Sequence, residues 1–520
     1  MNRTVKTVLG LLTVGLVALT SCKQDDKGLR ENEGTTYASV AINLQSDLRA
    51  EAGADENNYN LKGQWNGKDA IESVAVYIVS KGEVSFGEYS VGDFEITKAT
   101  DDTNITITPK KAILTTPGEK EVYVLLNAPT EITERIKKSI PTYFKEAYAK
   151  AVEDVTTAQI AKTEADKGDI IMMTNAAESK LTVEDGITKE QALATTSPKN
   201  RASVSVKRAV ARVLLTTTQD TYTVTYPDGS TMGTISNITY AVAQGEKAFY
   251  LSQKKGDQGV ILTPAYEFMP IADPSNPVKL TNYDAQAKAY DYSDLNKMDR
   301  SAIVATDLTT ALEIGKKSLE QSVFIFEASH KFGQAGETVA NYTGDFRRGN
   351  TPYVLVRTKF VPAKFATENE KEEYEQNGDG TFYLGEDGLF YADNTVSPNP
   401  KEPSIRPDQK YVKYVNGKVL YYAFVNPDVI NKTLNAPAYR NNIYHISVTG
   451  FKTIGTNWNP LYPEDPDTDN PQNPDPKPKD DPNTPPIKPD DPNTPNETYM
   501  AVDVTVIPWN VHTYGIELSI

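Results

Sequence analysis

The chain has 520 residues, a formal net charge of −16 at pH 7 and a single cysteine. Its length exceeds what one hydrophobic core supports and suits two domains, while the acidic charge argues against nucleic-acid binding, which needs clustered Lys and Arg. One cysteine excludes an intramolecular disulfide and a cysteine-ligated metal site, so stability has to come from packed cores. The 29 tyrosines and abundant Val and Thr favour strands, so we expect a mainly β fold.

The N-terminus has the layout of a lipoprotein signal peptide. Basic Arg3 and Lys6 precede an apolar run over residues 8–19, and the run closes on a lipobox at Leu19–Cys22. A run this short is typical of a secretory signal rather than of a membrane-spanning helix. We therefore expect residues 1–22 to direct export and Cys22 to carry a lipid, each buried acyl methylene of which contributes about 0.8 kcal/mol to membrane attachment. The alternative is an ordinary signal peptide with a chance cysteine.

The first strand predicted beyond this signal is amphipathic. Over residues 36–45, apolar Ala38, Val40, Ile42 and Leu44 alternate with mostly polar residues, which is the period of a strand with one buried face. Burial of Val40, Ile42 and Leu44 would stabilise a domain by roughly 5 to 9 kcal/mol, at about 1.5 to 3 kcal/mol each. Removal of this strand would therefore open a groove in a hydrophobic core.

A basic residue follows this strand directly. Arg49 lies in the polar segment 46–51, and the Gly, Asn and Asp residues after it extend a strand poorly. Cleavage between Arg49 and Ala50 would remove residues 23–49 as a propeptide, together with the strand. Arg30 is an alternative cleavage point that would leave the strand in place.

The residues up to 200 are predicted to form a first domain. Strands are expected at Ser73–Val79, Asn104–Thr108 and Glu121–Leu126. Pro141–Val152 is predicted as a helix because its apolar residues recur at three- and four-residue spacing behind an N-terminal proline. Polar residues then mark a domain junction near residue 200, so we expect an N-terminal β-sandwich over residues 50–200 with a small helical insertion.

The second half continues as short strands. Val204–Leu215 indicates a pair of strands. Further strands are predicted at residues 221–226, 235–242, 322–326, 353–360, 418–425 and 443–448. Many short strands separated by turn residues are typical of β-sandwiches, so we expect a C-terminal β-sandwich over residues 201–459.

Residues 460–497 differ abruptly from the rest of the chain. Between Pro460 and Asn496, 13 of the 37 residues are proline and nine are acidic, which excludes a core of their own. The hexamer Asp-Asp-Pro-Asn-Thr-Pro that begins at residue 480 recurs at residue 490. We expect a solvated spacer, which as polyproline II would extend about 3.1 Å per residue and span on the order of 100 Å.

Two amphipathic strands follow the spacer, in an arm over residues 498–520. Their alternating apolar residues are Met500, Val502, Val504 and Val506 in the first strand, and Tyr514, Ile516, Leu518 and Ile520 in the second. An apolar strand face needs a groove, either in its own body or in a neighbour's. The arm would therefore close the chain's own C-terminal sheet or be donated to a second copy, and repeated donation would build a head-to-tail filament.

Six segments carry a resemblance to a known family over essentially the whole chain. They are the lipobox Leu19–Cys22, the Arg49 site, Lys120–Asn127, Val206–Leu215, Tyr439–Val448 and Val504–Asn510. In this order they resemble the Bacteroidales fimbrillins, or type V pilins, and most closely the shaft subunit of their minor (short) fimbriae. The resemblance implies two tandem transthyretin-like β-sandwich domains, export as an outer-membrane lipoprotein, maturation by an arginine-specific protease and assembly by donor-strand exchange.

The Pro/Asp spacer departs from a generic fimbrillin. It leaves open whether Met500–Ile507 or Tyr514–Ile520 is the donor strand, and whether the arm first lies on its own domain.

The leading interpretation is a structural shaft subunit of a cell-surface adhesive fimbrium that mediates cell adhesion and biofilm formation. Its partners would be further copies of itself head to tail, accessory fimbrial subunits, an arginine-specific protease, and receptors on host or bacterial surfaces. The membrane would be contacted only through the lipid of the precursor, which would be an outer-membrane lipoprotein. The alternatives are an accessory tip or anchor subunit, and a monomeric surface lipoprotein that binds glycan or a host protein.

Sequence signatures of catalysis are lacking. His330, His445 and His512 are the three histidines, far apart and with no nucleophile elbow, zinc-binding motif or phosphate loop nearby. We expect no enzymatic activity, no cofactor and no metal site.

Overall fold

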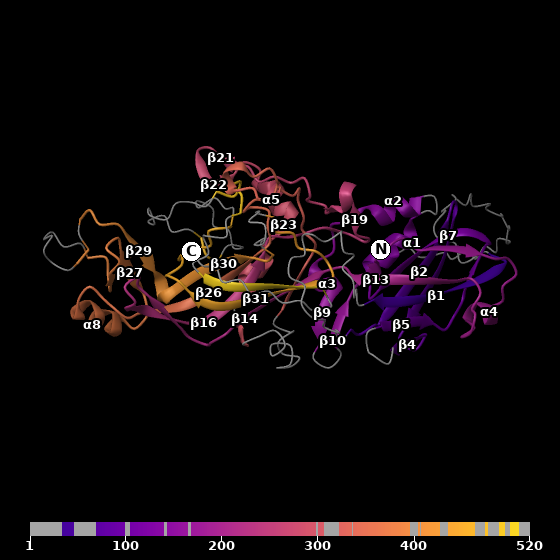
Figure 1. The fold of residues 1–520 in the computed structure, drawn as a ribbon, viewed down its shortest axis with the longest axis horizontal. Coiled ribbons are helices and arrows are strands. Elements are labelled where there is room, and N and C mark those ends of the chain that lie inside the picture. The colour runs from indigo at the N-terminus through magenta and orange to yellow at the C-terminus, as the bar shows by residue number, and fades with distance from the viewer. Residues whose placement is uncertain are drawn as a thin grey trace, which may run out of the picture.

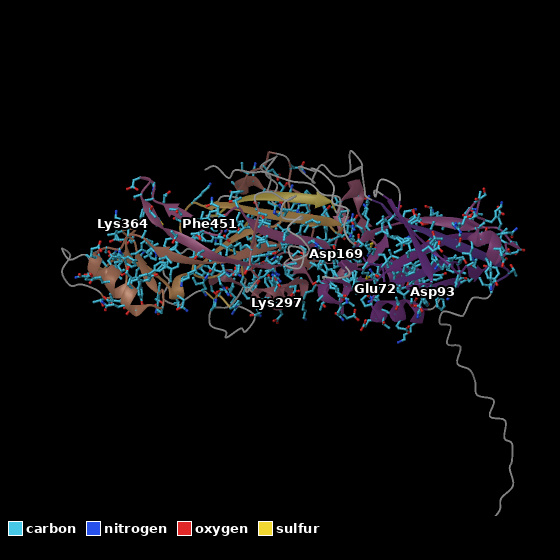
Figure 2. All side chains as sticks on the ribbon, turned by 90° about the horizontal axis from the view of Figure 1, so that it is seen from below. Glu72, Asp93, Asp169, Lys297, Lys364 and Phe451 are labelled. Carbon is cyan, nitrogen blue, oxygen red and sulfur yellow. The ribbon has the colours of Figure 1, made fainter. Side chains whose placement is uncertain are left out.

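The computed structural model describes residues 34–45, 69–98, 104–139, 143–164, 168–297, 300–305, 322–334, 336–395, 404–405, 407–426, 435–462, 474–476, 488–493 and 500–508. These residues form an elongated molecule with two β-rich halves arranged end to end, as Figures 1 and 2 show from two directions. The mainly β class predicted from the sequence is confirmed.

The N-terminal half is built on one ten-stranded sheet. Its strands are β1 (Thr36–Gln45), β2 (Ser73–Ser80), β3 (Glu83–Ser90), β4 (Phe94–Lys98), β5 (Asn104–Pro109), β6 (Ile113–Thr115), β7 (Gly118–Leu126), β11 (Met173–Asn175), β12 (Lys180–Val183) and β13 (Arg201–Arg208). They run in the spatial order β3-β2-β7-β11-β13-β1-β5-β4, with β12 beside β7 and β6 beside β1. The strand expected at residues 36–45 is therefore present and lies inside the sheet.

The two faces of this sheet bury different cores. On β2, Val76 and Ile78 join the core that also takes the apolar side chains of β1, β5 and β13. Tyr77 points to the other face, where α1 (Thr130–Lys138) and α2 (Phe144–Ala149) cover the sheet with their buried side chains. Because successive side chains of a strand point to opposite faces, β2 contributes side chains to both cores. The apolar side chains of β1 belong to the first of these cores.

The helix predicted at Pro141–Val152 is shorter than expected. α2 ends at Ala149, and Ala151–Val152 form a short strand, β8, that pairs with β18 (Phe249–Tyr250) of the second half. Pairing across the two halves therefore overrides the helical spacing at this end.

The crossing between the two halves lies later than the junction expected near residue 200. β13 pairs with β1 and β11 in the first sheet, whereas β14 (Ala211–Thr217) belongs to a sheet of the second half. The chain crosses at Ala209–Val210, with no linker between the strands. The strand pair indicated at Val204–Leu215 exists, but one member lies in each half.

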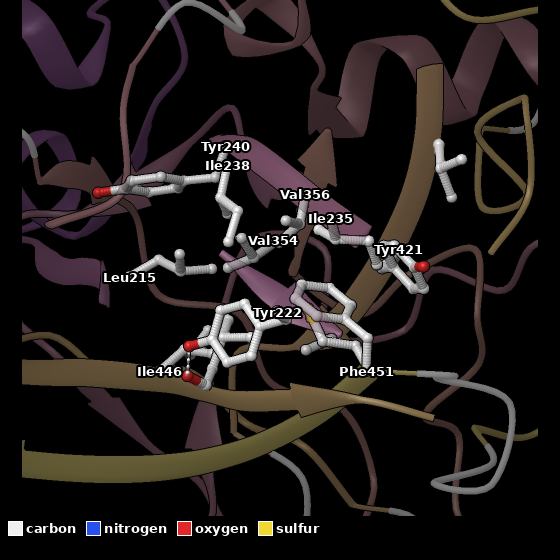
Figure 3. Close-up of a cluster of buried hydrophobic side chains, with 14 of the residues drawn as sticks. Leu215, Tyr222, Ile235, Ile238, Tyr240, Val354, Val356, Tyr421, Ile446 and Phe451 are labelled. Carbon is white, nitrogen blue, oxygen red and sulfur yellow. Dashed lines mark hydrogen bonds between the residues drawn. The ribbon is translucent and has the colours of Figure 1, made fainter. Parts of the chain in front are cut away.

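The C-terminal half is a sandwich of two sheets. One sheet holds β15 (Tyr222–Thr225), β16 (Thr231–Ala243), β26 (Tyr353–Pro362) and β30 (Lys418–Phe424), in that spatial order. The other holds β14, β24 (Ile303–Val304), β25 (Val323–Ile325), β31 (Asn442–Phe451) and β32 (Met500–Pro508). Apolar side chains from both sheets, among them Leu215, Val354, Val356 and Ile446, meet in the core between them (Figure 3).

Shorter helices and strands lie around these three sheets. They are α3 (Thr157–Ile160), β9 (Ala161–Glu164), β10 (Gly168–Ile171), α4 (Lys189–Leu193), β17 (Gly245–Glu246), β19 (Lys254–Lys255), β20 (Ile261–Leu262), β21 (Ala272–Asp273), β22 (Asn276–Leu280), α5 (Tyr283–Ala289), β23 (Tyr290–Asp291), α8 (Glu368–Asn377), β27 (Phe382–Gly385), β28 (Phe390–Tyr391) and β29 (Tyr411–Tyr414). Among the described residues, no helix is long and apolar enough to cross a membrane.

A shared core and a buried ion pair join the two halves. Phe249, Phe326 and Ile443 of the second half pack in the same cluster as the helices of the first. Arg212 of β14 contacts Asp169 of β10 at 2.5 Å, and both side chains are at most 1% exposed. Asp169 lies midway along the molecule in Figure 2. The halves therefore form one packed body rather than two tethered domains.

Candidate strand-exchange site

The candidate site is the slot that β1 fills. On one side β1 pairs in parallel with β13, from Ser39 opposite Arg201 to Leu44 opposite Val206. On the other side it pairs antiparallel with β6 at its start and with β5 at its end. Backbone ladders thus hold β1 along both edges, and its removal would leave unpaired groups on β13, β5 and β6.

The apolar face of β1 is buried along its length. Ala38, Val40, Ile42 and Leu44 are 0, 1, 0 and 9% exposed. They pack in the same core as side chains of β2, β5, β7 and β13. The residues expected to form the removable strand therefore plug the core of the N-terminal half.

Polar contacts fix the register of β1. The Asn200 side chain donates through Nδ2 to the Tyr37 carbonyl oxygen at 3.0 Å. The backbone carbonyl oxygen of Asn200 accepts from the Ser39 N–H at 3.0 Å. Ser39 Oγ donates to the Ala192 carbonyl oxygen at 2.6 Å and accepts from Arg201 Nε at 2.9 Å. A one-residue slip would break these bonds and turn the apolar face outward.

This set of polar partners was not predicted from the sequence. Asn200 has a left-handed backbone with φ of 48°, which Asn tolerates better than most residues, and it lies in the polar stretch taken for a domain junction. No sequence signal links it to a strand more than 150 residues earlier.

A polar cluster supports the β6 end of the slot. The Thr115 carbonyl oxygen accepts from the Thr35 N–H at 3.1 Å, and Ser85 Oγ donates to Thr115 Oγ1 at 3.0 Å. Beside them, Lys120 Nζ contacts Glu83 Oε2 at 3.0 Å. Burial pushes the pKa of Glu83 up, but hydrogen bonds from Thr116 and Lys120 outweigh it, so the pKa lies below its ordinary value.

The first strand of the C-terminal arm lies on its own half. β32 pairs antiparallel with β31, from Met500 opposite Phe451 to Pro508 opposite Asn442, and Met500 is fully buried in the sandwich core. This is the placement in which the arm closes its own sheet. Val502, Val504 and Val506 lie within the paired strand.

β32 runs toward the middle of the molecule. β31 is parallel to β14, which starts at the crossing between the halves, and β32 is antiparallel to both. Pro508 therefore arrives beside Asn442, next to Asn441, whose Oδ1 accepts from Arg208 Nη1 of the first half at 3.1 Å. β32 therefore runs toward the N-terminal half of its own subunit, as the yellow strand beside β31 in Figure 1 shows.

Several predicted site residues lie outside the described residues. They are Cys22, Arg49, Ala50, Ile516, Leu518 and Ile520. Of the histidines, His330 and His445 are buried: His445 Nε2 lies 2.7 Å from Thr216 Oγ1, and burial lowers the pKa of His330 to about 4. No group of metal-ligating side chains occurs among the residues that the structure describes.

Comparison with known proteins decides the family. The chain is 30% identical to the minor fimbrium subunit Mfa1 of Porphyromonas gingivalis, over 98% of this chain and 98% of that protein. The chain belongs to the fimbrillin family. A second Mfa1 sequence of that species matches with the same identity and coverage. As a fimbrillin, the protein is a structural subunit of cell-surface fimbriae and not an enzyme, as the sequence predicted.

The family profile described as "Major fimbrial subunit protein type IV, Fimbrillin, C-terminal" matches residues 412–515 of this fimbrillin. That range contains β30, β31 and β32. Among solved structures, a putative cell adhesion protein of Parabacteroides distasonis aligns with a TM-score of 0.42 and 13% identity, over 91% of this chain and 99% of that chain. The tip fimbrial protein Mfa3 of Porphyromonas gingivalis aligns with a TM-score of 0.31 and 9% identity, over 81% and 97%.

Proposed function

We propose that this fimbrillin is the shaft subunit of an adhesive fimbrium and polymerises by donor-strand exchange after proteolysis. The observation that carries the proposal is the position of β1, an interior strand with a buried apolar face that ends four residues before Arg49. A strand held on both edges leaves a sheet only at high cost, and a vacated slot of this kind requires a replacement.

The proposed sequence of events begins with export. Cys22 carries the lipid that holds the precursor at the outer membrane, with β1 in its slot. An arginine-specific protease cuts between Arg49 and Ala50, which leaves a mature chain of 471 residues without the lipid and without β1. The slot between β13 and β5 is then the acceptor for the arm of a second copy.

The arm over residues 498–520 supplies the donor. Its two alternating faces are Met500–Val506 and Tyr514–Ile520. Because β32 has a place in its own sheet, we assign Tyr514–Ile520 the insertion into the neighbour and β32 the role of a stored connection. Repeated insertion gives a head-to-tail homopolymer, to which accessory subunits and surface receptors are the further partners.

The chain from Lys23 to Ile520 tests this proposal. After treatment with an arginine-specific protease, we expect an Ala50 N-terminus by Edman sequencing, a ladder of SDS-resistant oligomers, and filaments by electron microscopy. Arg49→Lys should abolish all three, while the matched control Arg30→Lys should leave them unchanged. Deletion of residues 509–520 should leave the cleavage intact and remove the ladder.

Two results would overturn the proposal. An intact N-terminus after protease treatment would favour a surface lipoprotein that keeps its lipid. An Ala50 terminus on a protein that stays monomeric would favour an accessory subunit.

A further inference from the structure

Two short pieces of the Pro/Asp spacer lie against the C-terminal half. They are residues 474–476 and 488–493, and within them Asp475 and Asn493 are only 1% and 3% exposed. The sequence predicts a solvated spacer, and a solvated spacer keeps its polar side chains in water. These pieces are therefore bound to the surface of the sandwich.

The first contact is a carboxylate held by two cations. Asp475 Oδ2 accepts from Arg357 Nη2 of β26 at 2.6 Å, and Oδ1 accepts from Lys418 Nζ of β30 at 2.6 Å. The backbone oxygen of Asp475 also accepts from the Asn459 N–H at 2.9 Å. Charge-assisted bonds of this length are among the stronger polar contacts in proteins.

The surroundings of this contact are basic in an acidic protein. Arg357 and Lys418 also line a cavity of about 310 Å³, together with Lys359 and with neutral residues. The described residues of this lining include three basic side chains and no acidic one. Asp475 therefore supplies a carboxylate to a local cluster of positive charge.

The second contact is made by backbone. The Gly349 N–H donates to the Pro489 carbonyl oxygen at 2.8 Å, and the Arg348 N–H donates to the Asp491 carbonyl oxygen at 3.1 Å. Asn493 Nδ2 donates to Thr351 Oγ1 at 3.0 Å. A Cβ on Gly349 would lie 2.9 Å from the Pro489 side chain, so glycine permits this close approach.

The loop that makes this second contact is held from inside the half. Gln244, which is fully buried, donates through Nε2 to the carbonyl oxygens of Arg348 and Thr351 at 2.8 and 2.7 Å. The loop is thus ordered by its own half rather than by the spacer.

We propose that the C-terminal half carries a binding site for a proline-flanked aspartate, filled here by Pro474-Asp475-Pro476. Together with the contact at residues 488–493, this site holds the spacer down and keeps β32 stored on β31. The flanking prolines suit this role because they restrict the backbone and reduce the entropy lost on binding.

Docking of the spacer sets the reach of the arm. Six residues, 494–499, separate the second contact from Met500, which is about 19 Å at about 3.1 Å per residue. With both contacts released, the 37 residues 463–499 would span about 115 Å on the same basis. The spacer is then either a short strap or a long tether, and the two contacts together decide between these states.

The binding site is tested on the uncleaved chain from Lys23 to Ile520, independently of assembly. A protease that cuts after lysine cleaves the spacer between Lys479 and Asp480, because Lys477 and Lys488 both precede proline, and the cleavage rate reports release of the strap. Arg357→Gln leaves the spacer sequence unchanged and should raise the rate about five- to tenfold, because it removes a charge-assisted bond. Lys364→Gln, the same loss of one positive charge on exposed Lys364 just beyond the end of β26, should leave the rate unchanged.

A double variant separates release of the strap from damage to β26. Arg357→Gln combined with Asp475→Asn should be cut no faster than Asp475→Asn alone, since Asp475→Asn already removes the carboxylate that Arg357 binds. Equal rates for Arg357→Gln and Lys364→Gln, with equal melting temperatures, would overturn the binding site.

The proposed role of the spacer contacts, which is to keep β32 on β31 until assembly, rests on the proposed function. After arginine-specific cleavage, Arg357→Gln should form the oligomer ladder several-fold faster than Lys364→Gln. Faster spacer cleavage with an unchanged ladder rate would overturn storage and leave the binding site standing. If no chain forms a ladder, the proposed function fails, and the effect of Arg357→Gln on spacer cleavage still decides the binding site.

Discussion

The two strands nearest the ends of the described chain, β1 and β32, are held in opposite ways. β1 lies inside its sheet, with β13 on one side and β5 and β6 on the other, and its apolar face fills a core. Among the described strands, β32 is the last of its sheet and pairs with β31 alone. An interior strand leaves only when two ladders break and a core opens, whereas an edge strand leaves when one ladder breaks. In the proposed assembly, this difference suits a covalent cut to the release of β1 and the reversible spacer contacts to the release of β32.

Removal of β1 is expected to have the largest effect. A chain from Ala50 to Pro508 should lose roughly 5 to 9 kcal/mol in the N-terminal half relative to a chain from Lys23 to Pro508, because three buried apolar side chains and two ladders are lost. Urea unfolding with separate probes for the two halves measures this loss. A synthetic peptide of residues 34–45 should restore the stability, and equal stability of the two chains would contradict the interior role of β1.

Truncation of one buried side chain of β1 should have the next largest effect on stability. Ile42→Ala should lower the free energy of unfolding by about 2 to 5 kcal/mol, because Ile42 is fully buried and the change leaves a cavity. Asn43→Ala, the neighbouring residue on the outer face, is the control and should cost about 1 kcal/mol through its bond to Ser203. Similar losses for the two variants would show that the face of β1 is not what holds it.

Truncation of Met500 in the edge strand β32 should have a local effect rather than a global one. Met500→Ala should weaken the hold on β32 by about 2 kcal/mol and raise hydrogen exchange along β31, with little change in global unfolding, because the arm can leave without opening the sandwich. Met232→Ala removes the same side chain from the same core but from β16. It should lower global stability without selective exchange at β31, and the same exchange pattern in both variants would contradict the edge role.

The smallest effect concerns the cluster at the start of β1. The pKa of Glu83 is lowered in the folded chain, so its contribution is present above the unfolded pKa and is lost as pH falls through the folded pKa. Because Glu83 is partly exposed, the contribution should be below about 1 kcal/mol. Glu83→Gln should flatten the acid side of the stability profile, measured by thermal unfolding between pH 3 and pH 6, and an unchanged profile would exclude this coupling.

The sequence predicted what depends on local pattern. The strand at residues 36–45 and those later numbered β26, β30 and β31 were placed within a few residues, since alternation and β-branched content act within each segment. α1 was missed because only Ile132 and Ile136 mark its buried face in a polar stretch.

What depends on distant pairing was not predictable. β13 belongs to the first sheet because it pairs with β1, which is more than 150 residues earlier in the chain, so the boundary near residue 200 came too early. The hydrogen bond from Asn200 to Tyr37 of β1 was not predictable for the same reason, since it also joins residues far apart in the sequence. The Asp475 contact was hidden because one of nine acidic residues in a low-complexity segment meets two cations that lie on separate strands.

The crossing at Ala209–Val210 has a mechanical consequence. Because β13 continues into β14 without a linker and the halves share a core, a pull on a strand in the first sheet passes along one continuous backbone into the second. The subunit therefore offers little compliance of its own. In a fimbria built from such rods, bending and recoil would be concentrated at the joints between copies.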